Sequence, residues 1–322
     1  METRSFVRHW SLLGTFAVVI VFLSTLIAGQ LRAQTPAGSS SSRTSQQQTK
    51  NDQAQIPPDH YDPDDIKTYE DVLAEDREVA IREQSFKVHF YRPRTAAAKV
   101  LAIYACGDGG WRGLAPRTAQ QLAHIGFAVA GIDSKVYLQD LSSPEKPLTI
   151  KMLASDYTQI ADALRSYASA DTATPVFVYG WSLGAGFAIA VGSDISARGN
   201  WAGIVAIGLP AQNQLVRGLG GNHADLRNPA NSRFGFRSEA VLSQLTPVPL
   251  VMIESTSDSA SPQKVSKRLF AAAHDPKEYV LINAENHRFS GARNEFYSAL
   301  GNAVTWIRQV RGEASHKTEG KL

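Results

Sequence analysis

The sequence predicts an α/β protein whose central sheet is mostly parallel, with helices on both faces and an antiparallel hairpin leading into it. Between residues 99 and 310, short apolar runs alternate with longer segments of helical periodicity. Repeated strand–helix–strand units of this length require a parallel sheet. Before them, the stretch EVAIREQSFKVHFYRP at 78–93 shows two alternating segments, which is typical of a hairpin.

Each element of this fold has a local signal. Continuous apolar runs predict buried strands at 99–106, 127–133, 175–180, 201–209, 249–255 and 278–284. Helical periodicity predicts helices at 115–125, 149–169, 183–194, 263–273 and 295–310. The segment from about 210 to 248 is irregular and rich in Gly, Asn and Arg. It lies where a cap over a ligand site is inserted, so we expect a cap-like insertion there.

The 322 residues divide into four segments by composition. Residues 1–33 combine a basic start, an uncharged apolar stretch and a small residue at Ala33. This pattern is typical of a cleaved secretory signal, and its length also fits an uncleaved membrane anchor. Residues 34–64 predict a disordered Ser/Gln-rich linker, 65–311 the α/β domain, and 312–322 a disordered polar tail. We therefore expect an exported or periplasmic protein, either free or tethered to the inner membrane.

Composition excludes several classes of function. The net charge is only +3, without the concentrated basic stripe of a nucleic-acid-binding protein. Cys106 is the single cysteine, so neither an intramolecular disulfide nor a cysteine-based metal cluster can form. No phosphate-binding or metal-ligating motif appears, and we expect neither a metal nor a cofactor.

One hydroxyl stands where a nucleophile would be placed. Gly-Trp-Ser-Leu-Gly at 180–184 puts Ser182 between a predicted strand and a predicted helix. A strand-to-helix turn of this pattern, called a nucleophile elbow, raises the serine oxygen above the carboxyl edge of a sheet. The alternative is an ordinary Gly/Ser connection, which the five residues alone do not exclude.

A serine nucleophile needs a base and an acid that orients it. Asp258 follows the strand predicted at 249–255, and His287 follows the one predicted at 278–284. Parallel strands bring both to the same edge of the sheet as Ser182. Glu254 is a second candidate for the acid. Taken singly, Asp258 is also explained as a helix N-terminal residue and His287 as a solvated loop histidine.

Acyl transfer also needs donors for an oxyanion. The main-chain N–H of Leu183 predicts one donor, and Asp108 or Gly109 in the loop Cys-Gly-Asp-Gly-Gly-Trp at 106–111 predicts the other. The alternative for this loop is a turn stabilised by the Asp108 side chain. Three further residues are predicted to contact substrate: Trp111, Asp133 and Trp181. Asp133 is equally explained as the cap of the following turn.

These stretches together resemble a known family. The runs YACGDGGWR at 104–112, GIDS at 131–134 and YGWSLGA at 179–185 look like the VirJ/AcvB family of bacterial exported proteins. The resemblance implies an α/β-hydrolase fold, a periplasmic serine hydrolase and, as substrate, lysyl-phosphatidylglycerol or a related aminoacyl lipid. Residue by residue, it implies Ser182 as nucleophile, Asp258 as acid and His287 as base.

Three functions are consistent with the sequence. The first is an exported serine hydrolase that cleaves the ester of aminoacyl-phosphatidylglycerol at a membrane surface. Arg217, Arg227, Arg233 and Arg237 would then meet an anionic headgroup, or else form a solvated basic loop. The second is a non-catalytic accessory protein of a secretion system or envelope complex. The third is a general esterase or peptidase of small molecules.

Overall fold

A computed structural model describes residues 69–218 and 225–312, all of which belong to one compact unit, Ile56–Leu322. The expected signal or anchor at 1–33, the linker at 34–64 and all but the first residue of the tail at 312–322 lie outside the described residues. Within the two described ranges, no helix combines the length and the apolarity needed to cross a membrane.

A mostly parallel sheet forms the centre of the described chain. Its strand order is β1-β2-β4-β3-β5-β6-β9-β10. The strands are β1 (Val72–Ile81), β2 (Gln84–Pro93), β3 (Val100–Ala105), β4 (Phe127–Ile132), β5 (Val176–Trp181), β6 (Trp201–Ile207), β9 (Leu250–Ser255) and β10 (Lys277–Ile282). The pairs from β4 to β10 are parallel, whereas β1 with β2 and β2 with β4 are antiparallel. The predicted sheet and its leading hairpin are therefore confirmed.

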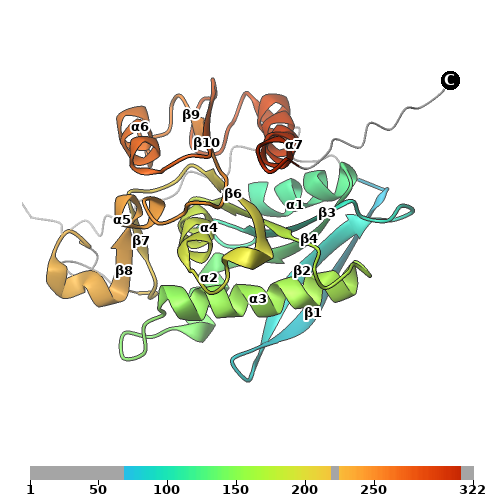
Figure 1. Cartoon of the computed structure of the whole chain (residues 1–322), viewed down its shortest axis with the longest axis horizontal. Coiled ribbons are helices and arrows are strands. Elements are labelled where there is room, and N and C mark those ends of the chain that lie inside the picture. Colours follow the sequence, from blue (N-terminus) through green and yellow to red (C-terminus); the bar gives the residue numbers. More distant parts are fainter. Residues whose placement is uncertain (1–68, 219–224, 313–322) are drawn as a thin grey trace, which may run out of the picture. The chain divides into compact units, whose positions relative to one another are not determined.

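Helices cover both faces of this sheet (Figure 1). On one face lie α1 (Leu114–His124) and α7 (Arg293–Val310); on the other lie α2 (Ser134–Leu141), α3 (Ile150–Tyr167), α4 (Leu183–Ser193), α5 (Ser238–Leu242) and α6 (Gln263–Ala272). The apolar core correspondingly forms two large clusters, one on each face. Every residue of β3, β5, β6 and β9 is buried, which explains why these strands are continuous apolar runs in the sequence.

The hairpin is attached to the helical layer through its turn. Arg82 and Glu83 join β1 to β2 with φ of 49° and 67°, the left-handed conformation that a two-residue hairpin loop requires. The Arg82 guanidinium donates to the Leu141 carbonyl at 3.1 Å, and its Nε lies 3.1 Å from Oδ1 of the buried Asp156 on α3. These contacts offset the backbone strain of the turn and hold the edge hairpin against α2 and α3.

The predicted insertion contains structure of its own. Strands β7 (Gln212–Gln214) and β8 (Gly235–Arg237) form a separate two-stranded sheet, and a 3-10 turn, Pro229–Phe234, and α5 lie in the same segment. The buried Asn213 lies between α5 and α4, and its Nδ2 donates to Ser238 Oγ of α5 at 2.8 Å. A Cβ at Gly186 of α4 would lie 1.9 Å from Asn213 Oδ1, so only glycine allows this approach. The insertion is thus packed one helical turn from Ser182.

Candidate active site

Ser182 stands on a strained turn between β5 and α4. Its φ and ψ are 55° and −117°, a combination that non-glycine residues rarely adopt and that costs about 1–3 kcal/mol. A Cβ on Gly180 would lie 1.9 Å from the Gly184 carbonyl oxygen, and one on Gly184 would lie 2.1 Å from the Ala105 carbonyl oxygen. Both glycines are therefore required sterically. This geometry is that of a nucleophile elbow rather than of an ordinary connection.

Main-chain hydrogen bonds hold the elbow on both sides of Leu183. The N–H of Ser182 donates to the Ile207 carbonyl at 2.8 Å, and that of Gly184 donates to the Cys106 carbonyl at 3.1 Å. In the described residues, the N–H of Leu183 has no acceptor. The predicted oxyanion donor is thus available to a ligand.

Asp258 and His287 are brought together from two loops. His287 Nδ1 lies 2.5 Å from Asp258 Oδ2, and the main-chain N–H groups of Ala260 and Ser261 both donate to Asp258 Oδ1 at 2.8 Å. Burial acts to raise the pKa of Asp258, but these hydrogen bonds and the histidine charge outweigh it and leave the pKa below its ordinary value. An ionised Asp258 accepts the Nδ1 proton, which leaves Nε2 as the basic nitrogen.

The environment of His287 fixes the orientation of its ring. Trp181 Nε1 donates to the His287 carbonyl at 3.2 Å, and the two ring centroids are 5.4 Å apart. On another side, a Cβ added to Gly208 would lie 2.6 Å from His287 Cε1 and 3.4 Å from Asp258 Oδ2. Gly208 has φ of 56° and lies directly after β6. Trp181, predicted as a substrate contact, is therefore placed by the structure against His287.

The serine and the histidine do not form a hydrogen bond in this structure. Within the described residues, His287 Nε2 is buried and has no hydrogen-bond partner. Nucleophile–base hydrogen bonds are often long without substrate and shorten in the Michaelis complex. Nε2 is thus the ring nitrogen left to receive a proton.

Glu254, the second candidate for the acid, is directed elsewhere. It is fully buried at the end of β9, and its Oε1 accepts from the Leu209 N–H at 3.2 Å. Burial raises its pKa well above the ordinary value, which favours the neutral form of the carboxyl. Glu254 contacts the main chain at Leu209, whereas Asp258 contacts His287. The geometry favours Asp258.

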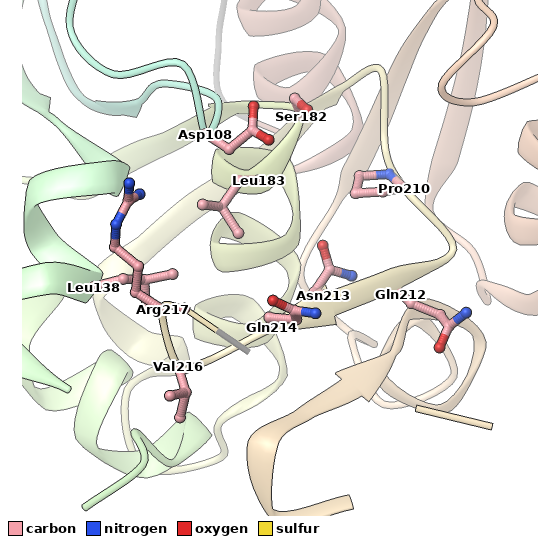
Figure 2. A pocket seen from close by; sticks show the side chains of 11 residues that line it. Asp108, Leu138, Ser182, Leu183, Pro210, Gln212, Asn213, Gln214, Val216 and Arg217 are labelled. Carbon is pink, nitrogen blue, oxygen red and sulfur yellow. The ribbon is translucent and has the colours of Figure 1, made fainter. Parts of the chain in front are cut away.

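A pocket of about 560 Å³ opens beside Ser182. Figure 2 shows Asp108, Ser182 and Leu183 at one end of it, with β7 along its floor. Its remaining lining residues come from α2 and the insertion: Leu138, Pro210, Gln212, Asn213, Gln214, Val216, Arg217 and Gly218. The insertion therefore forms one wall of this pocket. The wall combines amide groups and a guanidinium with apolar side chains, so the pocket suits a ligand that has both polar and apolar parts.

Three residues that the sequence predicts for the site, Trp111, Asp133 and Gly109, are absent from the lining of this pocket. Trp111 does not line the pocket: its ring stacks on His89 with centroids 4.7 Å apart and covers Gly131 on the opposite face of the sheet. Asp133 accepts from the N–H groups of Trp111, Lys135 and Val136 at 3.0–3.1 Å, which makes it the cap of this turn and of α2. Gly109 is absent from the lining of the pocket as well, whereas Asp108 belongs to it.

The four arginines of the insertion have different surroundings. Arg217 lines the pocket. Arg227 forms an ion pair with Asp225 at 2.9 Å, Arg237 lies 3.8 Å from Glu239, and Arg233 stacks over the Phe234 ring. Only Arg217 among them is positioned for a ligand of this pocket. The described residues include no group of three or more His, Cys, Asp or Glu side chains that could hold a metal ion.

Solved structures with this architecture establish the fold as that of an α/β hydrolase. An esterase named Est1E from Butyrivibrio proteoclasticus superposes with a TM-score of 0.55 at 13% identity, covering 73% of this chain and 99% of its own. A protein from Klebsiella pneumoniae assigned as a dienelactone hydrolase gives 0.56 at 13% identity, covering 74% and 99%. The esterase domain of a Rhodothermus marinus protein gives 0.50 at 18% identity, covering 74% and 98%. Identities this low establish the fold alone.

The family signal is carried by the middle of the chain. Residues 99–200, about a third of the sequence, match the family described as bacterial virulence protein (VirJ). This segment includes the loop after β3 and the elbow, and its match confirms the resemblance predicted from the sequence. No curated protein matches the chain.

Proposed function

We propose that this protein is a serine hydrolase that cleaves a carboxylic ester through an acyl-enzyme. The observation that carries the proposal is the strained elbow of Ser182 on the same sheet edge as the 2.5 Å contact between His287 and Asp258. A binding scaffold has no need of a serine in a costly conformation or of an oriented histidine. The esterases among the structures that share the fold support the same reaction class.

The proposed reaction has two balanced steps. Ser182 Oγ attacks the ester carbonyl carbon while its proton passes to His287 Nε2, and the carbonyl oxygen takes the negative charge. The N–H groups of Leu183 and Asp108 bind this oxyanion. The intermediate collapses, the C–O bond to the alcohol breaks, and Nε2 returns the proton to the departing oxygen. Water then releases the acid by the same route and restores Ser182.

For the substrate, we propose aminoacyl-phosphatidylglycerol. The family resemblance supports this choice, and so does Arg217, whose guanidinium lines the pocket and suits a phosphate oxygen. We also propose that the protein acts outside the cytoplasm, at the membrane leaflet that holds this lipid. The basic and apolar residues at 1–33 support export.

A fluorophosphonate probe tests the reaction class. The full chain is labelled, and the adduct is located by peptide mass spectrometry. We expect one adduct, on Ser182, which Ser182→Ala abolishes. Ser166→Ala, at an exposed position on α3, should label like the wild type. Equal labelling of Ser182→Ala would refute the proposal and favour the accessory role.

Lipid analysis tests the substrate. Purified protein should release amino acid from vesicles that contain lysyl-phosphatidylglycerol, and cells that lack the protein should accumulate this lipid. If Ser182 is labelled but the lipid is neither cleaved nor accumulated, the hydrolase assignment stands and the substrate proposal fails.

A further inference from the structure

The carboxylate of Asp108 lines the pocket beside Ser182 and is not used by the fold. Asp108 is exposed, and it forms no hydrogen bond or ion pair with another side chain or main-chain group in the described residues. The loop does not need it, because the turn is capped by Asp133. Figure 2 shows the Asp108 carboxylate at the same end of the pocket as Ser182.

The loop that carries Asp108 touches the elbow. A Cβ on Gly107, the preceding residue, would lie 3.3 Å from the Cβ of Ser182. Under the proposed function, the main-chain N–H of Asp108 receives the ester's carbonyl oxygen. The α-carbon of the acyl group is bonded to that same carbonyl carbon. A substituent on the α-carbon is therefore within reach of the side chain of the residue whose amide binds the oxygen.

A carboxylate at this position has opposite effects on acyl groups that carry an α-ammonium group and on acyl groups that are uncharged. Negative charge develops on the carbonyl oxygen in the transition state, and a second negative charge nearby opposes it. An α-ammonium group between the two neutralises the carboxylate and removes the repulsion. An uncharged acyl group of the same shape leaves the repulsion in place. The other charged side chain of the pocket, Arg217, has the wrong sign for an ammonium group and suits the alcohol part of the ester.

We propose that Asp108 is a specificity-determining residue that binds the α-ammonium group of an aminoacyl ester. The inference rests on the proposed hydrolase function and adds the group that selects the acyl part. This role would distinguish the protein from esterases whose acyl pocket is uncharged. Here the positive charge that neutralises Asp108 comes from the ammonium group of the substrate.

Two isosteric substrates test this role. Alanine benzyl ester and isobutyric acid benzyl ester differ only in an ammonium group in place of a methyl group. Their kcat/KM values are compared at about pH 6, below the α-amino pKa of about 7.7–8.0. We expect the wild type to prefer the alanyl ester, and Asp108→Asn to lower the alanyl-to-isobutyryl ratio at least ten-fold by slowing the first reaction and accelerating the second. Asp140→Asn, an equal loss of charge at an exposed position of α2, should keep the wild-type ratio.

A second measurement serves if Asp108→Asn does not fold. In the wild type, the alanyl-to-isobutyryl ratio should fall as the pH rises past the α-amino pKa, because the substrate loses its charge while the isobutyryl ester reports any titration of the enzyme. An unchanged ratio in a folded Asp108→Asn, or a preference that persists to about pH 9.5, would overturn the role of Asp108. Absence of Ser182 labelling together with hydrolysis of neither ester would instead refute the hydrolase function itself.

Discussion

Trp181 supports His287 from the residue next to the nucleophile. Its indole Nε1 donates to the His287 carbonyl at 3.2 Å, and its ring lies against the imidazole with centroids 5.4 Å apart. Since Trp181 is the last residue of β5 and is buried, the position of the proposed base is tied directly to the elbow.

Trp181→Phe should slow the reaction without abolishing it. The variant keeps an aromatic ring but loses one hydrogen bond, worth about 0.5–1.5 kcal/mol, so we expect kcat to fall roughly 2- to 12-fold with a small change in KM. Trp306→Phe, on α7 away from Ser182, is the matched control and should retain the wild-type kcat. Equal kcat values for the two variants would show that the contact does not position His287.

Asp258→Asn should nearly abolish turnover. The Asn carbonyl oxygen can keep the bonds from Ala260 and Ser261, but its amide nitrogen cannot accept the Nδ1 proton of His287. The histidine then adopts the wrong tautomer, and we expect kcat to fall on the order of 10³- to 10⁴-fold, measured with the ester identified in the vesicle assay. A folded Asp258→Asn with wild-type turnover would exclude Asp258 as the acid.

Gly208→Ala should displace the His287–Asp258 pair. The new methyl group would lie 2.6 Å from His287 Cε1, so the ring must shift, and we expect kcat/KM to fall at least ten-fold, a loss of about 1.4 kcal/mol or more. Gly126→Ala is the control: Gly126 also has a positive φ, but nothing lies within 4 Å of its Cβ position. If both variants lose equal activity, backbone strain rather than the contact with His287 is responsible.

Glu254→Gln should change how stability depends on pH. In the folded protein the buried carboxyl stays protonated above 4.5, its ordinary pKa, whereas the unfolded chain ionises there. Unfolding above this pH therefore releases a proton, and the contribution of Glu254 to the free energy of unfolding falls as the pH rises toward its folded pKa. The glutamine variant lacks this loss. The melting temperature of the variant minus that of the wild type should therefore increase by at least about 2–4 °C when the pH is raised from about 5 to about 8. A constant difference would show that Glu254 ionises in the folded protein.

The sequence predicted the sheet and the three candidate residues because both depend on local signals. Fully buried strands such as β3 and β5 are continuous apolar runs, and Ser182, Asp258 and His287 each follow such a run. The contacts of the loop after β3 could not be predicted in the same way. Whether Asp108 or Asp133 caps that turn depends on the pairing of β3 with β4, which brings Asp133 to the Trp111 amide.

Two further features depended on contacts between distant segments. Helix α2 begins at the cap formed by Asp133, a residue that the sequence also suggested for substrate binding. Gly208 was included in the strand predicted at 201–209. In the structure it follows the last residue of β6, has a positive φ and lies so close to His287 that a Cβ there would clash with the ring. The sequence contains Gly208 as a plain glycine after an apolar run, which gives no signal of a contact 79 positions further along the chain.

Substitutions at the two positions that flank Ser182 in the elbow would affect different properties of the site. Gly180 and Gly184 cannot accept a side chain, while Trp181 and Leu183, on either side of Ser182, belong to the cores on opposite faces of the sheet. Trp181 contacts the proposed base, and Leu183 contacts the pocket. A substitution at 183 can therefore alter which acyl groups are accepted, and one at 181 can alter proton transfer through His287. Substrate range and catalytic rate can then diverge separately among related chains.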